Sequence, residues 1–314
     1  MNNIVQLNFD DVVAAHNRIK SHVNKTPIFT SEILNKKLGA QVFFKMENEQ
    51  IAKSFKARGA FNAILNYKEK HGNFPEKIVV QSSGNHAQAI ANACKEFGIS
   101  ALVYMITKAS PAKINATKAL GAEVVLLEKR SEVNEAAEKK QQEGYVFIHP
   151  SDNDDVICGQ GTSALEAIQE IGEVDAIFAP CGGGGLLSGC FLVAQKLSPK
   201  AKVFACEPLN GNDVAISIRE NKIFAFEDTP NTIADGARTL HSSQRCLSYI
   251  KQMAGVLEIT EEEIDFWQKE FSEIFGKKIE TTPALAIAGA ERFLKENINL
   301  NNPKILVIIS GGNI

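Results

Sequence analysis

The sequence lacks any run of charge of one sign and any long apolar segment. Its 314 residues hold 34 Lys and Arg against 37 Asp and Glu, without a basic cluster. Because nucleic-acid binding requires a concentrated basic surface, we predict no nucleic-acid partner. No stretch approaches the roughly 18 apolar residues of a membrane span, and the start at Met1 lacks the basic and apolar regions of a secretory signal. We therefore predict a cytoplasmic protein with no membrane partner.

Closely spaced cysteine pairs are also missing. The six cysteines stand at positions 94, 158, 181, 190, 206 and 246 and form no CxxC motif. A chain of this length does not depend on disulfides, and most of these cysteines have apolar neighbours in the sequence. We interpret them as reduced thiols that pack as small hydrophobic side chains, and not as nucleophiles or metal ligands.

The sequence does contain a regular alternation of short β-rich runs and longer amphipathic segments. Strands are predicted at Lys77–Ser82, Ala101–Met105, Glu123–Leu127, Tyr145–Ile148, Asp175–Ala179, Lys202–Cys206, Gly255–Ile259 and Lys304–Ser310. Helices bounded by Pro or Gly signals are predicted at Ala87–Phe97, Pro111–Leu120, Ser131–Glu143 and Leu186–Leu197. This order predicts the α/β class, with open, mostly parallel twisted sheets and helices on both faces.

No Pro-, Gly- or Ser-rich linker divides the chain into two halves. Residues 76–150 nevertheless hold four evenly spaced strand–helix units, which are enough for a small sheet of their own. The later strands predict a second, larger sheet. A cleft between the two sheets follows from this arrangement.

Four consecutive glycines follow the strand Asp175–Ala179 and precede an apolar helix. They are Gly182, Gly183, Gly184 and Gly185. Such a loop turns backbone N–H groups toward one point at a helix N-terminus, where a phosphate binds well. The run matches neither the P-loop pattern nor strict GxGxxG, which excludes a P-loop NTPase. A dinucleotide-dependent oxidoreductase stays open, because Glu207 ends the next strand where a ribose-binding acid would lie.

A lysine in a second segment is a candidate nucleophile. Lys56 follows the apolar Phe55 and lies close to two further cations, Lys53 and Arg58. Apolar surroundings and positive neighbours both lower the pKa of an amine and make it nucleophilic. A solvated basic helix start is the alternative interpretation of the same residues.

Small polar residues open the helix that follows the strand Lys77–Ser82. They read Ser82-Ser83-Gly84-Asn85-His86. Hydroxyls and free amides at a helix start can bind a carboxylate, and the Asn85 amide can donate to a phenolate oxygen. An N-cap followed by a turn is an equally acceptable interpretation of these residues alone.

Together these motifs resemble the serine/threonine dehydratase and serine racemase family, which are pyridoxal-phosphate enzymes of the tryptophan-synthase β-like fold type II. The resemblance rests on Lys45-x-Glu47, Ser54-Phe55-Lys56-x-Arg58-Gly59, Ser82-Ser83-Gly84-Asn85-His86-Ala87, Gly182–Gly185 and Ser310-Gly311-Gly312-Asn313. It implies a two-domain fold. Residues 1–75 and 151–314 would form a discontinuous large cofactor-binding domain, and residues 76–150 a small mobile domain.

The resemblance also assigns roles to residues. Lys56 would carry pyridoxal 5'-phosphate as a Schiff base and later remove the Cα proton of the substrate. The other cofactor contacts would be Phe55, Asn85, Gly182, Gly183, Gly184, Gly185 and Ser310. The substrate carboxylate would bind to Ser82, Ser83, Asn85 and His86. In racemases of the family a serine matching Ser83 acts from the opposite face, so Ser83 is a second candidate catalytic residue.

A metal site is implied as well. Glu207, Gly211 and Asp213 resemble the family's divalent-cation loop, in which two carboxylates and one carbonyl offer hard oxygen ligands to Mg²⁺, Mn²⁺ or Ca²⁺. The alternative is a loop with two solvated acids. A metal-ligating Glu207 also counts against the dinucleotide interpretation, because the same carboxylate does not easily serve both ligands.

From the resemblance we first expect a homodimeric L-serine/L-threonine ammonia-lyase. Such an enzyme releases a 2-oxo acid and ammonia from a small amino-acid substrate. Serine racemase and 3-hydroxyaspartate dehydratase are the alternatives within the family. The latter gains support from Arg238, which could pair with a second substrate carboxylate, although a surface position for Arg238 is also compatible with the sequence. A nucleotide-binding regulatory module and the dinucleotide oxidoreductase are the alternatives outside it.

Overall fold

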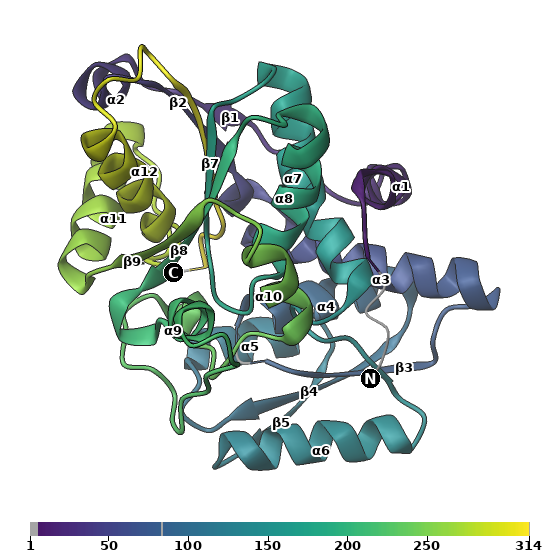
Figure 1. Cartoon of the computed structure of the whole chain (residues 1–314). Coiled ribbons are helices and arrows are strands. Elements are labelled where there is room, and N and C mark those ends of the chain that lie inside the picture. The colour runs from purple at the N-terminus through teal and green to yellow at the C-terminus, as the bar shows by residue number, and fades with distance from the viewer. Residues whose placement is uncertain (1–5, 83, 314) are drawn as a thin grey trace.

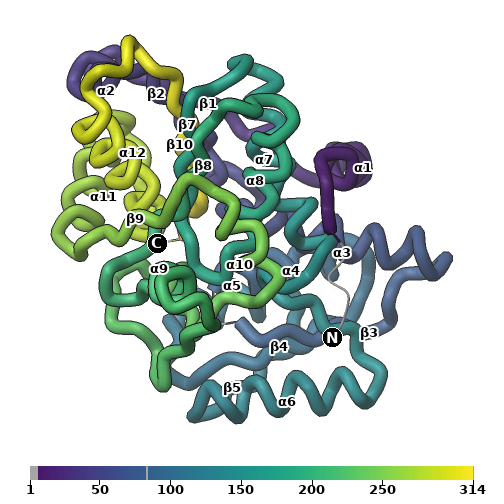
Figure 2. Tube along the Cα trace, viewed as in Figure 1, coloured from purple at the N-terminus to yellow at the C-terminus, as the bar shows by residue number. Residues whose placement is uncertain are grey.

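A computed structural model of the chain describes residues 6–82 and 84–313 and contains two sheets flanked by helices (Figure 1). The larger sheet has the strand order β1-β2-β10-β7-β8-β9, and the smaller sheet has the order β5-β4-β3-β6. Along the tube in Figure 2, β1 and β2 of the larger sheet come first, β3 to β6 of the smaller sheet follow, and the chain then returns to the larger sheet with β7 to β10. No helix within the described ranges is long and apolar enough to cross a membrane.

The strands are parallel except for the pair of β1 with β2. Those of the larger sheet are β1 (Ile28–Phe29), β2 (Gln41–Met46), β7 (Ala176–Pro180), β8 (Lys202–Pro208), β9 (Gly255–Ile259) and β10 (Lys304–Ile309). Those of the smaller sheet are β3 (Lys77–Gln81), β4 (Ser100–Ile106), β5 (Glu123–Leu127) and β6 (Val146–Phe147).

The helices of the first half are α1 (Phe9–Ile19), α2 (Glu32–Leu38), α3 (Lys56–His71), α4 (Asn85–Phe97), α5 (Pro111–Ala119) and α6 (Arg130–Gln142). Those of the second half are α7 (Asp154–Ile171), α8 (Gly185–Leu197), α9 (Asp213–Arg219), α10 (Gln244–Ile250), α11 (Glu261–Phe275) and α12 (Ala284–Glu296). Short 3₁₀ turns lie at η1 (Glu47–Glu49), η2 (Ile51–Lys53), η3 (Leu209–Gly211) and η4 (Asp235–Ala237).

Each face of each sheet has its own hydrophobic core. On the larger sheet, α1, α7, α8 and α10 cover one face, and α2, α11 and α12 cover the other, as Figure 1 shows for the layer of α11 and α12. On the smaller sheet, α3, α4 and α5 share one core, whereas α6 packs on the opposite face. Coverage on both faces explains why the strands are continuous apolar runs and not alternating ones.

The α/β prediction is confirmed, and the eight predicted strands appear as β3 to β10. The four predicted helices are α4, α5, α6 and α8, each within two residues of its predicted start. Gly98 ends α4 in the left-handed conformation, at φ 69°, as its position after the amphipathic run predicts. All strands of the smaller sheet fall within residues 76–150, but the division into two domains with a mobile smaller one stays a prediction.

Candidate active site

The carboxyl ends of four parallel strands bring the predicted motifs to one edge of the larger sheet. β2 leads toward Lys56, β10 leads into Ser310, β7 leads into the glycine loop, and β8 ends at Pro208, directly after Glu207. In open α/β sheets this edge is where ligands bind, because loops and helix N-termini converge there. The first cofactor motif and the last are joined directly, since the Phe55 N–H donates to the Ser310 carbonyl at 3.1 Å.

Lys56 is the first residue of α3 and is partly buried. Its Nζ donates to the carbonyl oxygen of Pro150 at 2.9 Å and lies 4.9 Å from the centre of the Phe55 ring. Burial lowers the pKa of the Lys56 amine to about 8. An amine with such a pKa loses its proton readily near neutral pH, as a nucleophile or a base requires.

The physical cause of that pKa differs from the one predicted. Lys53 is exposed, and the Arg58 guanidinium turns away into a buried cluster, where it donates to Glu47 at 2.7 Å and to Glu166 at 2.8 Å. Both carboxylates neutralise Arg58, so neither cation acts on the Lys56 amine. Desolvation alone explains the direction of the shift, and the predicted role of the neighbouring charges is wrong.

Arg58 instead fixes the first turn of α3. Its N–H donors meet acceptors on η1, on α7 and in the segment before β1, and Lys45 adds an ion pair to Glu166 at 2.7 Å. All of these side chains are nearly or fully buried. A buried charge cluster of this kind tolerates only one arrangement, because removing one member leaves another charge unpaired. The cluster therefore orients the helix that presents Lys56.

The glycine loop has the geometry of a phosphate cradle. Within residues 6–82 and 84–313, the backbone N–H groups of residues 182–187 donate to no protein acceptor. They lie at the N-terminus of α8, whose dipole favours an anion. Gly184 has φ 84°, and a Cβ on Gly183 would lie 2.2 Å from Ser151 Oγ. The residues present thus fit the phosphate of pyridoxal phosphate, with free donors and no side chain in the way.

Asn85 lies beside the turn after Ser310, although the two residues follow strands of different sheets, since a Cβ on Gly311 would lie 3.0 Å from Asn85 Nδ2. Ser310 follows β10 and is buried, as expected of a partner for the cofactor ring. Asn85 begins α4, donates from Nδ2 to Glu280 at 2.9 Å and accepts at Oδ1 from Asn313 at 2.9 Å. The second Nδ2 hydrogen leaves Asn85 able to donate to a further oxygen.

The predicted carboxylate loop is placed in part. Ser82 accepts from the Gly84 N–H at 3.3 Å, whereas Ser83 lies outside the described residues. The side chain of His86 is buried, and its Nε2 contacts the Ile148 carbonyl at 2.8 Å; burial lowers the pKa of this imidazole to about 3. His86 therefore offers its backbone N–H at the start of α4, and not a charged ring, to a substrate.

Three site residues were missed by the sequence analysis as functional candidates. Glu280 is buried against Asn85, and Ser151 lies against Gly183. His149 accepts at Nδ1 from the Asp152 N–H at 2.8 Å, and burial lowers the pKa of its ring to about 4. The segment His149-Pro150-Ser151 follows β6 of the smaller sheet. Ser82 was identified because it ends a predicted strand, and the same signal could have identified this segment.

The predicted metal ligands form a buried acidic pair. Glu207 accepts at Oε1 from the Val214 N–H at 3.1 Å and at Oε2 from the Ala215 N–H at 2.9 Å. Burial, and then the charge of Asp213, raise the pKa of Glu207 well above its usual range, and burial raises the pKa of Asp213 to about 7. Asp213 Oδ2 has no hydrogen-bond partner in the described part of the chain, and Gly211 lies in the adjoining buried turn.

Two carboxylates with an unpaired buried oxygen fit a cation, although no cluster of three or more His, Cys, Asp or Glu side chains occurs among the described residues. Backbone carbonyls and water complete many such oxygen sites. The donor set is therefore compatible with the hard divalent cations named above, and the metal itself remains a proposal.

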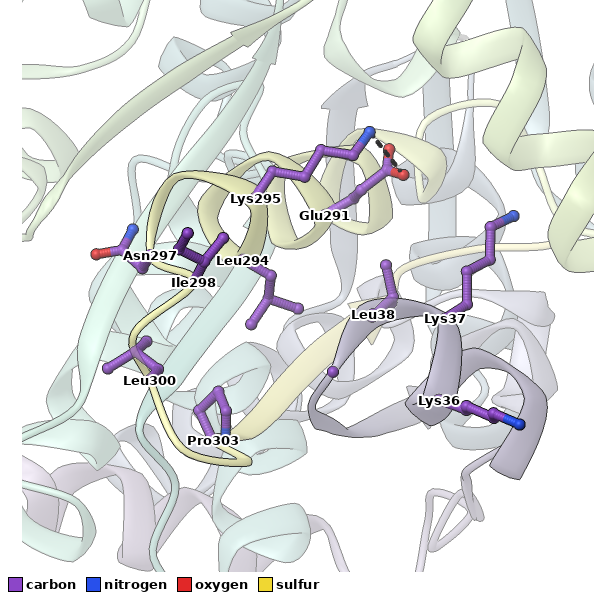
Figure 3. A pocket seen from close by; sticks show the side chains of 11 residues that line it. Lys36, Lys37, Leu38, Glu291, Leu294, Lys295, Asn297, Ile298, Leu300 and Pro303 are labelled. Atoms are coloured by element: carbon purple, nitrogen blue, oxygen red, sulfur yellow. Dashed lines mark ion pairs between the residues drawn. The ribbon is translucent and has the colours of Figure 1, made fainter.

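One surface pocket lies away from these residues. It has a volume of about 360 Å³ and lies between α2, the C-terminal end of α12 and Pro303 (Figure 3). Pro303 precedes β10 and Gly39 precedes β2, so this pocket opens at the amino ends of strands whose carboxyl ends carry the site. The length of β10, about 20 Å at 3.3 Å per residue, separates the two.

Comparison with known proteins agrees with this geometry. Residues 19–311 match the family described as pyridoxal-phosphate dependent enzyme. Serine racemase of Schizosaccharomyces pombe is 42% identical over 99% of this chain and 96% of its own. L-threo-3-hydroxyaspartate ammonia-lyase of Saccharomyces cerevisiae is 40% identical over 98% of this chain and 93% of its own.

A solved structure agrees as well. Maize serine racemase superposes with a TM-score of 0.93 at 32% identity and covers 99% of this chain and 94% of its own. The fold is thus fold type II, as the resemblance implies. With a lysine of lowered pKa, a glycine cradle for phosphate and a family match over nearly the whole length, the chain belongs to the pyridoxal-phosphate-dependent enzymes.

Proposed function

We propose that the protein racemises L-serine and, at the same site, eliminates the hydroxyl and ammonia from 3-hydroxy amino acids. The observation that carries the proposal is the Lys56 amine, whose pKa is lowered and which donates to the Pro150 carbonyl. The next residue, Ser151, packs against Gly183 of the glycine cradle, and the Lys56 charge acts on His86 at the start of α4. The relatives supply the substrate class, because they are serine racemases and 3-hydroxyaspartate ammonia-lyases. They favour these alternatives over the serine/threonine dehydratase that the motifs first suggested.

Each group of residues in the site has a separate role in the proposed reaction. The N–H groups of residues 182–187 would bind the cofactor phosphate, and Asn85 and Ser310 would contact its ring. When bound, pyridoxal phosphate supplies an electron sink for negative charge at Cα. Lys56 would take the Cα proton on its own face. The N–H groups of Asn85 and His86, which donate to no described residue, would hold the substrate carboxylate at the start of α4.

L-threo-3-hydroxyaspartate is the second candidate substrate. Arg238 is exposed, which agrees with the surface position that the sequence allows, and it is the residue proposed to bind the second carboxylate. The backbone just before Arg238 packs on the glycine loop, since a Cβ on Gly182 would lie 3.0 Å from the Gly236 carbonyl oxygen. Arg238 Nε donates to the Thr232 carbonyl at 2.8 Å, and its two terminal nitrogens bind no acceptor within the described residues. These nitrogens can form the paired contact that a second carboxylate prefers.

Replacing Ser83 by alanine tests the racemase activity. Racemisation needs a second proton carrier across the cofactor from Lys56, whereas elimination needs only one base and a leaving hydroxyl. We expect Ser83→Ala to lower D-serine formation by at least ~100-fold. Pyruvate formation should fall by only roughly threefold to tenfold, because one hydrogen bond in the carboxylate cradle is lost.

The assay follows D-serine and 2-oxo acid from L-serine, L-threonine and L-threo-3-hydroxyaspartate. The neighbouring Ser82→Ala variant is the matched control and should leave the ratio of the two products unchanged. A wild-type protein that makes 2-oxo acid but no D-serine would remove the racemase activity from the proposal. A Ser83→Ala protein that still racemises at full rate would assign the second base to another residue.

We propose a divalent cation between Glu207 and Asp213. Burial, and then the charge of Asp213, raise the pKa of Glu207, and a bound cation would offset both. Chelation should therefore lower the melting temperature by about 5 °C for a site filled at ~100 times its Kd. Adding Mg²⁺, Mn²⁺ or Ca²⁺ should restore it. Asp213→Asn should abolish the response, and the control Asp265→Asn, at an exposed position of α11, should keep it. If chelator leaves the melting temperature of the wild type unchanged, the loop holds two acids and no metal.

The homodimer and the cytoplasmic location also remain predictions. Light scattering on the purified holoenzyme measures the first, and imaging of a tagged full-length chain measures the second.

A further inference from the structure

Glu280 is a buried carboxylate at the centre of the site that the cofactor motifs do not include. It lies before α12 and is only 4% exposed. Its backbone N–H donates to the Gly311 carbonyl at 3.2 Å. Its carboxylate occupies the space beside the same glycine, since a Cβ on Gly311 would lie 2.3 Å from Glu280 Oε2. Glu280 is thus held against the turn that follows Ser310.

The carboxylate determines the orientation of the Asn85 amide. Glu280 Oε2 accepts from Asn85 Nδ2, and Asn85 Oδ1 accepts from Asn313 Nδ2, both at 2.9 Å. Asn313 Nδ2 also donates to the Ala52 carbonyl at 2.8 Å, which fixes it as the donor. Because Asn313 Nδ2 is the donor to Oδ1, the amide of Asn85 cannot turn over without losing that bond, and Glu280 Oε2 accepts from Nδ2 in the same arrangement. The second Nδ2 hydrogen of Asn85, which is not bonded to Glu280, consequently points in one fixed direction.

Ion pairing does not account for the burial of Glu280. The cation nearest to it is Lys113 of α5, whose Nζ lies 3.8 Å from Oε1, and Lys113 forms its hydrogen-bonded ion pair with Asp235 of η4 instead. Among the described residues no donor is bonded to Oε1. Burial, and then the charge of Asp235, raise the pKa of Glu280 to about 7, while Lys113 lowers it. Burying a carboxylate without an ion pair costs free energy, so we infer that Glu280 is kept for the residue it binds. The side chain that is hydrogen-bonded to it is Asn85.

We propose that Glu280 is a positioning residue that acts through Asn85, by aiming the free Nδ2 hydrogen of that amide at the ring oxygen of the bound cofactor. The inference rests on the proposed function insofar as the site holds pyridoxal phosphate. The contact between Glu280 and Asn85 joins α4, which begins at Asn85, to the turn after β10, which includes Ser310.

A double-mutant cycle on the holoenzyme tests the coupling. The variants are Glu280→Ala, Asn85→Ala and the double variant, and the measurements are the visible absorption maximum of the bound cofactor and its dissociation constant. We expect each single variant to shift the maximum in the same direction and to raise the dissociation constant by about tenfold. The double variant should match Asn85→Ala alone, because both changes remove one interaction.

Two further variants separate positioning from general stability. Glu280→Gln keeps a carbonyl oxygen that can accept from Asn85, so it should restore the wild-type absorption maximum. Glu291, on α12, accepts a hydrogen bond from Trp267 Nε1 of α11 at 3.0 Å and is not part of the cofactor motifs. The Glu291→Ala variant loses this bond and should lower only the melting temperature. The absorbance requires no substrate, so an incorrect substrate assignment leaves this test intact.

The outcomes are distinct. Additive shifts in the double variant, or a Glu280→Ala protein with an unchanged spectrum and a lower melting temperature, would overturn the positioning role. A Glu280→Gln protein that behaves like Glu280→Ala would do the same. A wild-type protein without any visible band would overturn the proposed function, and this inference with it.

Discussion

Replacing Lys56 by alanine is expected to abolish both the visible absorbance of bound pyridoxal phosphate and turnover. The buried amine has two roles in the proposed reaction, as the attachment point of the cofactor and as the base at Cα. Loss of a base alone costs up to ~10⁴-fold, so the loss of both roles should lower kcat by at least ~10⁴-fold. The nearest lysine in sequence, Lys53, is exposed and lies before the first turn of α3, so it is not placed to substitute for Lys56.

The measurement is the absorption spectrum of purified protein before and after borohydride, together with 2-oxo acid formation from L-serine. Lys53→Ala is the matched control, since it removes a lysine from the same segment and should keep a band that borohydride bleaches. Mass spectrometry after borohydride should add the mass of the reduced cofactor to the peptide that contains Lys56. A band and a labelled peptide that both persist in Lys56→Ala would assign the attachment to another lysine.

The sequence predicts the fold best where its periodicity is unbroken. Strands β3 to β10 are short apolar runs bounded by turn residues, and each was predicted within two or three residues of its ends. The strand β2 was missed because Lys45 interrupts its apolar pattern. Lys45 is fully buried there only because Glu166, 121 residues away, pairs with it at 2.7 Å. Local sequence contains no sign of such a distant partner.

The site was predictable to the extent that its chemistry is local. The glycine run and Lys56 are visible in short motifs, and the structure places both at the carboxyl edge of the sheet. The contact between Glu280 and Asn85 joins positions 195 residues apart, and Glu280 has no motif around it that marks it. The cause of the Lys56 pKa was missed for a related reason. Sequence proximity suggested that Arg58 acts on Lys56, whereas the fold turns Arg58 toward Glu47 and Glu166.

Replacing Gly183 by alanine is the second change with a large expected effect, and it acts on cofactor binding. The added Cβ would lie 2.2 Å from Ser151 Oγ and 2.9 Å from Ser151 Cβ. Rotation of the Ser151 hydroxyl relieves the first contact but not the second, so the backbone of the loop must shift. Overpacking of this kind costs about 1–3 kcal/mol, which corresponds to a roughly 5-fold to 150-fold rise in the dissociation constant of pyridoxal phosphate.

The rescue variant makes this prediction specific to the loop geometry. Ser151→Gly removes both atoms that the new methyl group would meet, so the double variant Gly183→Ala/Ser151→Gly should recover most of the cofactor affinity, judged against Ser151→Gly alone. Gly255→Ala is the matched control, because its Cβ would meet Phe204 at an ordinary 3.8 Å, and it should bind the cofactor like the wild type. Titration of apoenzyme with pyridoxal phosphate measures the four variants and the wild type. If Gly183→Ala binds the cofactor normally, the amides of this loop are not held in place by the contact with Ser151. If it binds weakly and the double variant recovers nothing, the methyl group obstructs the phosphate itself.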